Sequence, residues 1–236
     1  MPLNLTTTDP DFERGFAALL ATKREVSEDV DQVVRAIVVQ VRKDGDKALI
    51  ELTRRFDRLD LTAASIRVGE AEIAAAVAAS DREALAALEL ARGRIEAHHR
   101  RQLPADDRYT DALGAELGSR WTAIESVGLY VPGGLASYPS SVLMNAVPAK
   151  IAGVPRIAMA VPSPSGEMNP LVLAAAQIAG VSEIYRIGGA QAVAALAYGT
   201  ESVRAVAKIV GPGNAYVAAA KRIVFGDVGI DTIAGP

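Results

Sequence analysis

Apolar residues in the first half of the chain recur at the spacing of an α-helix. Between residues 30 and 41, valines and isoleucines fall on one helical face, and Ser27 is the expected N-cap of this helix. The breaker Asp44-Gly45-Asp46 predicts the end of that helix, and the apolar residues of 48–56 predict a second one. Both helices are expected to contribute to a hydrophobic core.

The next apolar runs predict a short strand and two more helices. The strand candidate is residues 66–68, and an alanine-rich helix is expected from about residue 70 to residue 79. A capping box from Ser80 to Glu83 predicts the start of a long helix that ends near His98 and His99.

His98 and His99 are the only histidines of the chain. They could form a metal site or an acid/base pair, but neighbouring positions on a helix point about 100° apart. A basic histidine near a helix C-terminus also complements the helix dipole. A surface position is therefore the simpler interpretation.

From Gly114 onward, short apolar runs alternate with helical runs. The strand-like runs are 126–131, 156–161, 183–187 and 205–210, and the helical runs are 140–152, 169–179, 190–198 and 215–224. Apolar strands that alternate with helices are typical of βαβ units, whose sheets are parallel and covered on both faces. The sequence therefore predicts an α/β protein, a Rossmann-like parallel sheet with helices on both faces, preceded by a mainly helical N-terminal half.

Each expected strand ends in a turn-forming segment. These segments are Pro132-Gly133-Gly134, Pro162-Ser163-Pro164, Gly188-Gly189 and Gly211-Pro212-Gly213. Because parallel strands end at one edge of the sheet, the four loops should lie together, where α/β proteins bind their ligands. The loop after the first strand could equally be an ordinary strand-to-helix turn.

Three polar side chains are expected at this edge. Asn214 follows two glycines and should cap the helix of 215–224, whose free N–H groups would suit a pyrophosphate. Tyr216 stands where the dinucleotide fingerprint has its third glycine, and capping alone could also explain Asn214. Gln191 adds a neutral amide and Tyr130 a phenol, so the three resemble a cofactor-binding surface with no ionisable catalyst among them.

The composition narrows the possible partners and compartments. The chain has 236 residues, half of them hydrophobic, and a net charge of −3. With no basic excess, neither a nucleic acid nor a membrane partner is implied. The chain lacks cysteine, and no apolar segment is long enough to span a membrane or resembles a leader, so a cytoplasmic protein is expected. The absence of cysteine also argues against a relative of the aldehyde dehydrogenases.

Several long motifs resemble histidinol dehydrogenase along essentially the whole chain. They are VRKDGD (41–46), GLYVPGG (128–134), ASYPSSVLMN (136–145), RIGGAQAVAALAYGT (186–200), KIVGPGNAYV (208–217) and DTIAGP (231–236). The resemblance implies a zinc-dependent enzyme of histidine biosynthesis, usually an intertwined homodimer, that oxidises L-histidinol through L-histidinaldehyde to L-histidine with two NAD⁺. By motif position, it places NAD contacts on Tyr130, Gln191 and Asn214. One departure is Ala207, where an aspartate is expected, and its effect should be confined to the local surface.

The resemblance places the family's substrate-binding serine, its zinc ligands and its Glu–His acid/base pair after Pro236. We therefore expect no catalytic and no metal-ligating residue among these 236 residues, and no turnover by the chain alone. The alternative is a non-catalytic nucleotide-binding or assembly module.

The resemblance also suggests three regions. Residues 1–25 would form an N-terminal arm, and residues 126–236 a Rossmann-like NAD-binding domain. Residues 26–125 would form a mainly helical segment that belongs to a domain completed by later sequence, and its helices should expose apolar faces.

Overall fold

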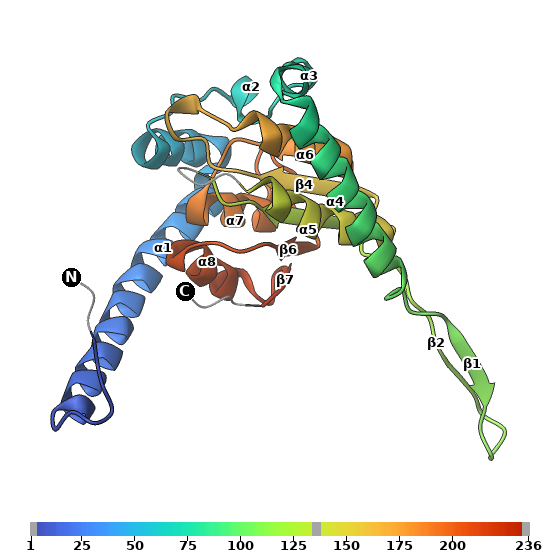
Figure 1. Cartoon of the computed structure of the whole chain (residues 1–236), viewed down its shortest axis with the longest axis horizontal. Coiled ribbons are helices and arrows are strands. Elements are labelled where there is room, and N and C mark those ends of the chain that lie inside the picture. Colours follow the sequence, from blue (N-terminus) through green and yellow to red (C-terminus); the bar gives the residue numbers. More distant parts are fainter. Residues whose placement is uncertain (1–3, 134–137, 233–236) are drawn as a thin grey trace.

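A computed structural model describes residues 4–133 and 138–232, except for the side chains of residues 21–28. Residues 134–137 and 233–236, which belong to three of the motifs above, lie outside the described residues. The elements are α1 (Phe12–Asp57), α2 (Ala63–Ile66), α3 (Glu70–Ala79), α4 (Arg82–Arg100), β1 (Asp107–Thr110), β2 (Glu116–Ser119), β3 (Ser126–Tyr130), α5 (Pro139–Ile151), β4 (Arg156–Ala160), η1 (Pro164–Gly166), α6 (Pro170–Ala179), β5 (Glu183–Tyr185), α7 (Gly189–Tyr198), β6 (Lys208–Val210), α8 (Ala215–Val224) and β7 (Gly229–Ile230) (Figure 1).

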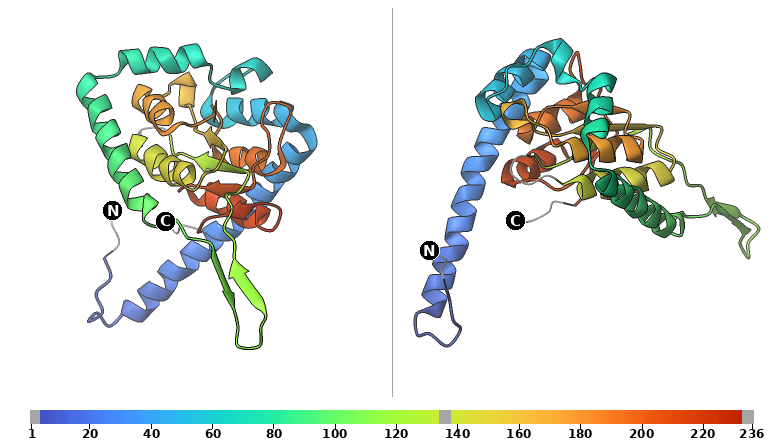
Figure 2. Two further views of the ribbon diagram at one scale, coloured as in Figure 1. Left: turned by 90° about the vertical axis from the view of Figure 1, so that its right-hand side faces the viewer. Right: turned by 45° about the horizontal axis from the view of Figure 1, so that its top comes forward.

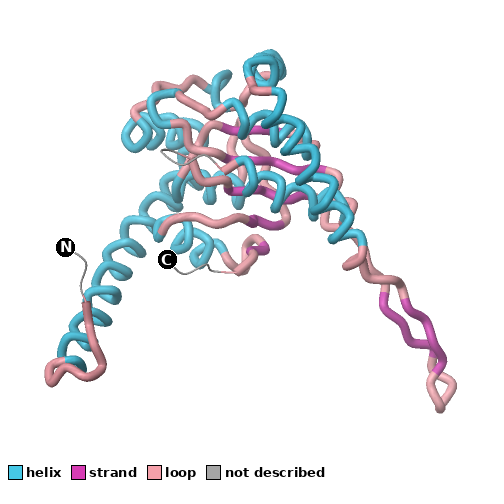
Figure 3. The backbone as a smooth tube through the Cα atoms, viewed as in Figure 1, coloured by secondary structure: helices cyan, strands magenta, loops and turns pink. Residues whose placement is uncertain are grey.

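The centre of the molecule is a parallel sheet with the strand order β5-β4-β3-β6-β7. Helices α5 and α6 pack on one face, with α3 and α4 outside them, and α1, α7 and α8 cover the other (Figures 1 and 3). Val127 and Leu129 of β3 belong to the core between the sheet and α5 and α6. Tyr130 belongs to the core between the sheet and α1, α7 and α8, because successive side chains of a strand point to opposite faces. The predicted Rossmann-like α/β fold is confirmed.

The expectation of two helical segments separated at Asp44-Gly45-Asp46 is confirmed by a kink at Gly45, but the expected start of the first segment at Ser27 is wrong. Helix α1 runs from Phe12 to Asp57 with Asp11 at its N-cap, so Ser27 lies inside the helix and does not begin it. The predicted breaker acts as a kink, because Gly45 has φ 54° and ψ −131° while the helix continues on both sides.

Gly45 is required at the kink for two reasons. Its positive φ is a conformation that glycine adopts without a steric penalty. In addition, a Cβ at this position would lie 2.3 Å from Oε2 of Glu201, which accepts a hydrogen bond of 2.8 Å from the backbone N–H of Asp46. The loop after α7 therefore sits directly against the kink.

The buried carboxylate of Asp46 ties the kink to that loop. Its Oδ1 accepts hydrogen bonds from Thr200 Oγ1 at 2.6 Å and from the Ser202 backbone N–H at 3.1 Å. Its Oδ2 accepts one from Ser202 Oγ at 2.5 Å. These bonds hold α1 in place across the sheet.

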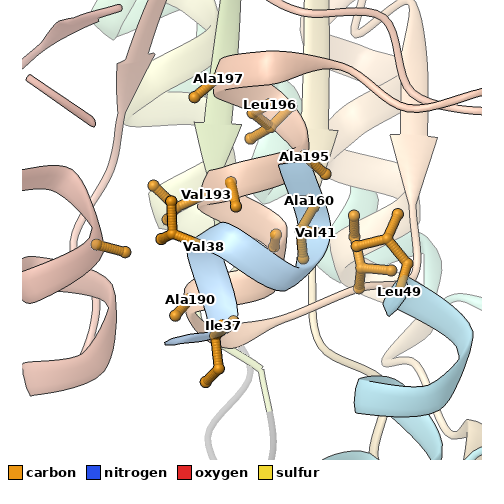
Figure 4. Close-up of a cluster of buried hydrophobic side chains, with 14 of the residues drawn as sticks. Ile37, Val38, Val41, Leu49, Ala160, Ala190, Val193, Ala195, Leu196 and Ala197 are labelled. Carbon is orange, nitrogen blue, oxygen red and sulfur yellow. The ribbon is translucent and has the colours of Figure 1, made fainter. Parts of the chain in front are cut away.

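Helix α1 packs along α7 in the larger of the two cores. Figure 4 shows Ile37, Val38 and Val41 of α1 facing the side chains of α7, among them Val193 and Leu196. Every residue of α7 from 190 to 197 is buried, which is the pattern of a helix enclosed on all sides. The small alanine side chains of α7 allow the neighbouring helices to approach closely.

Two smaller predictions also need correction. Asp81, not Ser80, caps α4, since its carboxylate accepts a hydrogen bond from the Ala84 backbone N–H, while Ser80 ends α3. The strand candidate 66–68 is not a strand: Ile66 ends α2, and Arg67 forms only an isolated antiparallel bridge to Tyr185.

Two parts of the structure project from the sheet: the N-terminal part of α1 and the antiparallel hairpin β1–β2 (Figure 2). Sequence patterns did not indicate the hairpin, because all residues of both strands are exposed and no apolar alternation marks them.

Most exposed large apolar side chains precede residue 126: Phe16, Leu20, Val33, Val39, Phe56, Leu90, Leu103, Tyr109, Leu113, Leu117, Trp121 and Ile124. The three proposed regions remain a prediction. Among the described residues, no helix combines the length and apolar character needed to cross a membrane.

We predict that Asp46→Ala lowers the free energy of unfolding by about 2–4 kcal/mol, because it leaves the donors of Thr200 and Ser202 unpaired. Urea denaturation followed by circular dichroism measures this change. Asp44→Ala, two residues away and exposed, is the matched control and should change stability by less than about 0.5 kcal/mol. Equal effects of the two substitutions would contradict the structural role of Asp46.

Candidate functional site

A cavity of about 1100 Å³ lies at the edge of the sheet where β3 and β6 end. Strands β3, β4 and β5 follow one another outward, and the chain then returns to place β6 on the other side of β3. The cavity is thus at the point where the strand order reverses, the usual ligand site of open parallel sheets. Its lining residues are Val33, Ala36, Ile37, Gln40, Leu52, Arg55, Phe56, Asp57, Tyr130, Pro132, Gly133, Tyr138, Ser141, Pro162, Pro164, Gly189, Ala190, Gln191, Pro212, Gly213, Asn214 and Tyr216.

Tyr130, at the end of β3, joins two of the loops around this cavity. Its hydroxyl oxygen accepts a hydrogen bond of 3.1 Å from the backbone N–H of Gly189, at the start of α7. Burial raises the pKa of the Tyr130 phenol, and the nearby charge of Asp57 adds to the rise, against the opposing effect of the Gly189 N–H. The phenol is therefore protonated at neutral pH and can donate its hydrogen to a ligand.

Gln191 lies in the first turn of α7 and is 2% exposed, with its side chain at the cavity wall. The residue before the helix is Gly188, where a Cβ would lie 2.4 Å from Cβ of Pro162. The loops after β4 and β5 therefore approach each other more closely than larger residues would allow.

Asn214 caps α8 as the sequence predicts. Its Oδ1 accepts hydrogen bonds of 3.1 Å from the backbone N–H groups of Tyr216 and Val217. The cap occupies the oxygen, so the Nδ2 amide group is the part of the side chain that could donate to a ligand. The structure thus brings Tyr130, Gln191 and Asn214 to one cavity, from the end of β3, the first turn of α7 and the N-cap of α8.

The opposite wall of the cavity comes from α1, and no sequence pattern indicated this. Arg55 and Asp57 are the only charged lining residues in the part of the chain that the structure describes, and the Arg55 guanidinium lies 5.2 Å from the centre of the Phe56 ring. Burial raises the pKa of the Asp57 carboxyl. No motif marks these residues as ligands, because they end an ordinary amphipathic helix.

An ion pair between the buried Lys221 and the partly exposed Asp231 holds the loop that precedes Asn214. The Lys221 ammonium of α8, whose side chain is 4% exposed, donates to the Gly211 carbonyl at 2.5 Å and to Asp231 Oδ1 at 2.6 Å. Oδ2 of Asp231 accepts from the Gly211 backbone N–H at 2.8 Å. Gly211 has φ 113°, and a Cβ there would lie 2.1 Å from the Tyr130 carbonyl oxygen, so this position excludes larger residues.

His98 and His99 lie in the last turn of α4, away from the cavity. Each approaches the side chain of Gln102, His99 Nδ1 at 2.6 Å and His98 Nε2 at 3.3 Å. Within the described ranges, no group of three or more His, Cys, Asp or Glu residues could hold a metal ion. Ala207 is exposed at the start of β6, at the opposite end of the strand from the cavity.

Comparison with known proteins places this geometry in a family. The sequence model described as histidinol dehydrogenase matches residues 20–236. The chain belongs to the histidinol dehydrogenase family. The histidinol dehydrogenase of Brucella abortus (strain 2308) is 72% identical over 236 residues, which are 100% of this chain and 55% of that protein. The histidinol dehydrogenase of Rhodopseudomonas palustris is 69% identical over the same share of each chain.

A solved structure agrees with the family assignment. The crystal structure of histidinol dehydrogenase from Elizabethkingia anophelis is similar with a TM-score of 0.83 and 38% sequence identity, covering 87% of this chain and 47% of that chain. The chain therefore spans about half the length of the histidinol dehydrogenases that it matches.

We predict that Lys221→Met lowers the free energy of unfolding by about 1–3 kcal/mol, because it removes the buried ammonium that bonds the Gly211 carbonyl and the partly exposed Asp231 carboxylate. Arg222→Met is the matched control. Arg222 pairs with Asp31 at the surface, so its loss should cost less than about 1 kcal/mol. Urea denaturation of both variants tests the difference, and a loss at Lys221 no larger than at Arg222 would be the contrary result.

Proposed function

We propose that this chain supplies the NAD-binding part of a histidinol dehydrogenase, which oxidises L-histidinol through L-histidinaldehyde to L-histidine. The observation that carries the proposal is the convergence of Tyr130, Gln191 and Asn214 on one cavity at the point where the strand order reverses. The family membership of the chain supports the reaction, and the cavity supports the cofactor.

The chemistry of the cavity suits a dinucleotide. Two helices, α7 and α8, begin at its edge, and the positive ends of their dipoles favour phosphate oxygens, although the N–H groups of Gly189, Tyr216 and Val217 already have partners within the protein. The Asn214 amide and the Tyr130 hydroxyl would add hydrogen bonds to the cofactor, and the Arg55 guanidinium would add a positive charge. One NAD⁺, when bound, would accept hydride from the substrate alcohol, and a second NAD⁺ that replaces the resulting NADH would accept hydride from the hydrated aldehyde.

Proton transfer and zinc binding need groups from elsewhere. The family implies zinc, but no cluster of suitable ligands occurs among the described residues, so we derive no step through the metal. We propose that the zinc ligands and the acid/base pair belong to the part of the full-length relatives that this chain does not match.

We also propose a homodimer for the complete protein. The projecting part of α1 and the hairpin β1–β2 support it, because both carry exposed large apolar side chains, such as Phe16, Tyr109 and Leu117. A second copy could cover these side chains. The cytoplasmic location stays a prediction.

The cofactor site can be tested with two capping asparagines. We predict that Asn214→Ala weakens NAD⁺ binding about tenfold in isothermal titration calorimetry, because the amide donor at the cavity is lost. Asn169→Ala is the matched control: Asn169 caps α6 in the same way, with Oδ1 accepting from the Leu171 backbone N–H, and does not line the cavity. Both variants should lose similar stability, about 1 kcal/mol.

Two results would contradict the cofactor site. One is the absence of NAD⁺ binding by the unaltered protein. The other is an equal effect of Asn214→Ala and Asn169→Ala on binding, which would mean that Asn214 acts only as a helix cap.

A turnover assay tests separately whether this chain alone can catalyse the oxidation of L-histidinol. We predict that the purified 236-residue chain with L-histidinol and NAD⁺ produces no NADH, because the cavity offers no metal site and no acid/base pair. Absorbance of NADH measures this. Detectable turnover would refute the prediction. A second assay adds the part of a full-length relative that this chain does not cover. NAD⁺ binding without turnover in that mixture would favour a non-catalytic binding module.

A further inference from the structure

One carboxylate of the cavity wall has an oxygen atom without a hydrogen-bond partner among the described residues. Asp57 is the last residue of α1, and its Oδ2 atom is buried with no hydrogen-bond partner among the described residues. A buried carboxylate oxygen without a donor costs free energy, so such an atom is normally satisfied by a side chain, by water or by a ligand. Asp57 also lines the cavity, and a rotation of its side chain would be needed to present Oδ2 to a ligand there.

The position of Asp57 in the fold can be compared with that of the ribose-binding acidic residue of other dinucleotide-binding folds. In dinucleotide-binding α/β folds, an acidic residue that follows the glycine-rich turn by about 20 residues hydrogen-bonds the ribose 2′-hydroxyl. Here β4 lies next to β3 and continues into Pro162-Ser163-Pro164, which contains no carboxylate.

Asp57 supplies a carboxylate beside this loop from a different element. Helix α1 contacts η1, which follows β4, and the side chain of Leu59 lies close to Gly166 of η1. Pro162 and Pro164 line the same cavity as Asp57. The end of α1 therefore brings an acidic group to the loop after β4.

The charges of the cavity restrict what Asp57 can accept. Among the described lining residues, Arg55 is the only cation, and its guanidinium lies against Phe56. Neutral donors of a ligand, such as hydroxyl groups, would therefore complement Asp57. In a dinucleotide, the neighbouring pair of ribose hydroxyls offers two donors to one carboxylate.

We propose that the Asp57 carboxylate binds a ribose of the dinucleotide by accepting hydrogen bonds from its neighbouring hydroxyls. This inference rests on the proposed NAD site. The position of Asp57 beside the loop after β4 favours the adenosine ribose. In that case Asp57 also disfavours NADP⁺, because the 2′-phosphate of NADP⁺ would place negative charge next to the carboxylate and replace a hydroxyl donor.

The test compares Asp57→Asn with the unaltered protein in isothermal titration calorimetry against NAD⁺, NADP⁺, ADP-ribose and nicotinamide mononucleotide. Asp57→Asn keeps the size of the side chain and removes its charge. Asp60→Asn is the control, because Asp60 is exposed and does not line the cavity. Urea denaturation confirms that each variant is folded, and Asp57→Ala replaces Asp57→Asn if the amide variant is not.

We expect Asp57→Asn to weaken NAD⁺ binding about tenfold and Asp60→Asn to leave it unchanged. Weaker binding of ADP-ribose, together with a smaller preference for NAD⁺ over NADP⁺, would identify the adenosine ribose. Weaker binding of nicotinamide mononucleotide with the NADP⁺ preference intact would identify the nicotinamide ribose. Either result supports the proposal.

The contrary results separate this inference from the proposed function. If the unaltered protein binds NAD⁺ and Asp57→Asn binds all four compounds as well as it does, the role of Asp57 is overturned and the cofactor site stands. If the unaltered protein binds none of them, both proposals fall.

Discussion

The hydrogen bonds of Asp46 fix the placement of α1, and the rest of the structure depends on that placement. They join the kink at Gly45 to the loop that follows α7. The two arms of α1, before and after Gly45, are therefore held against one face of the sheet near the kink. One arm packs along α7 and completes the larger core. The other arm ends at Asp57, beside the carboxyl ends of the strands. A helix with a different bend could not both cover α7 and form a wall of the cavity.

The cavity therefore has two walls of different origin and chemistry. Loops after the parallel strands form one wall, which presents helix N-termini and neutral hydrogen-bonding groups, including Tyr130, Gln191 and Asn214. Helix α1 forms the other and presents an aromatic ring and both charged groups, Arg55 and Asp57. This division suits a ligand with phosphates, sugar hydroxyls and flat rings, because each part meets a different kind of surface.

Several side chains serve the fold and the cavity together. Asn214 caps α8 with its oxygen while its amide group remains at the cavity, and Tyr130 accepts a hydrogen bond from the first N–H of α7 while its hydroxyl lines the same space. Lys221 and Asp231 hold the Gly211 loop from behind without reaching the ligand space themselves. These hydrogen bonds tie the loops that line the cavity to the rest of the fold.

The sequence by itself determined the α/β class, the order of strands and helices after residue 126, and the three polar residues at the edge of the sheet. These follow from apolar periodicity, turn residues and capping, which act over short stretches of chain. It did not determine the start of α1 at Phe12 or the contacts of the Gly45 kink with residues 200–202. Nor did it indicate the hairpin β1–β2 or the role of Asp57 in the cavity wall. Only the tertiary structure decided these, since they depend on which distant segments meet, and no local pattern of residues records that.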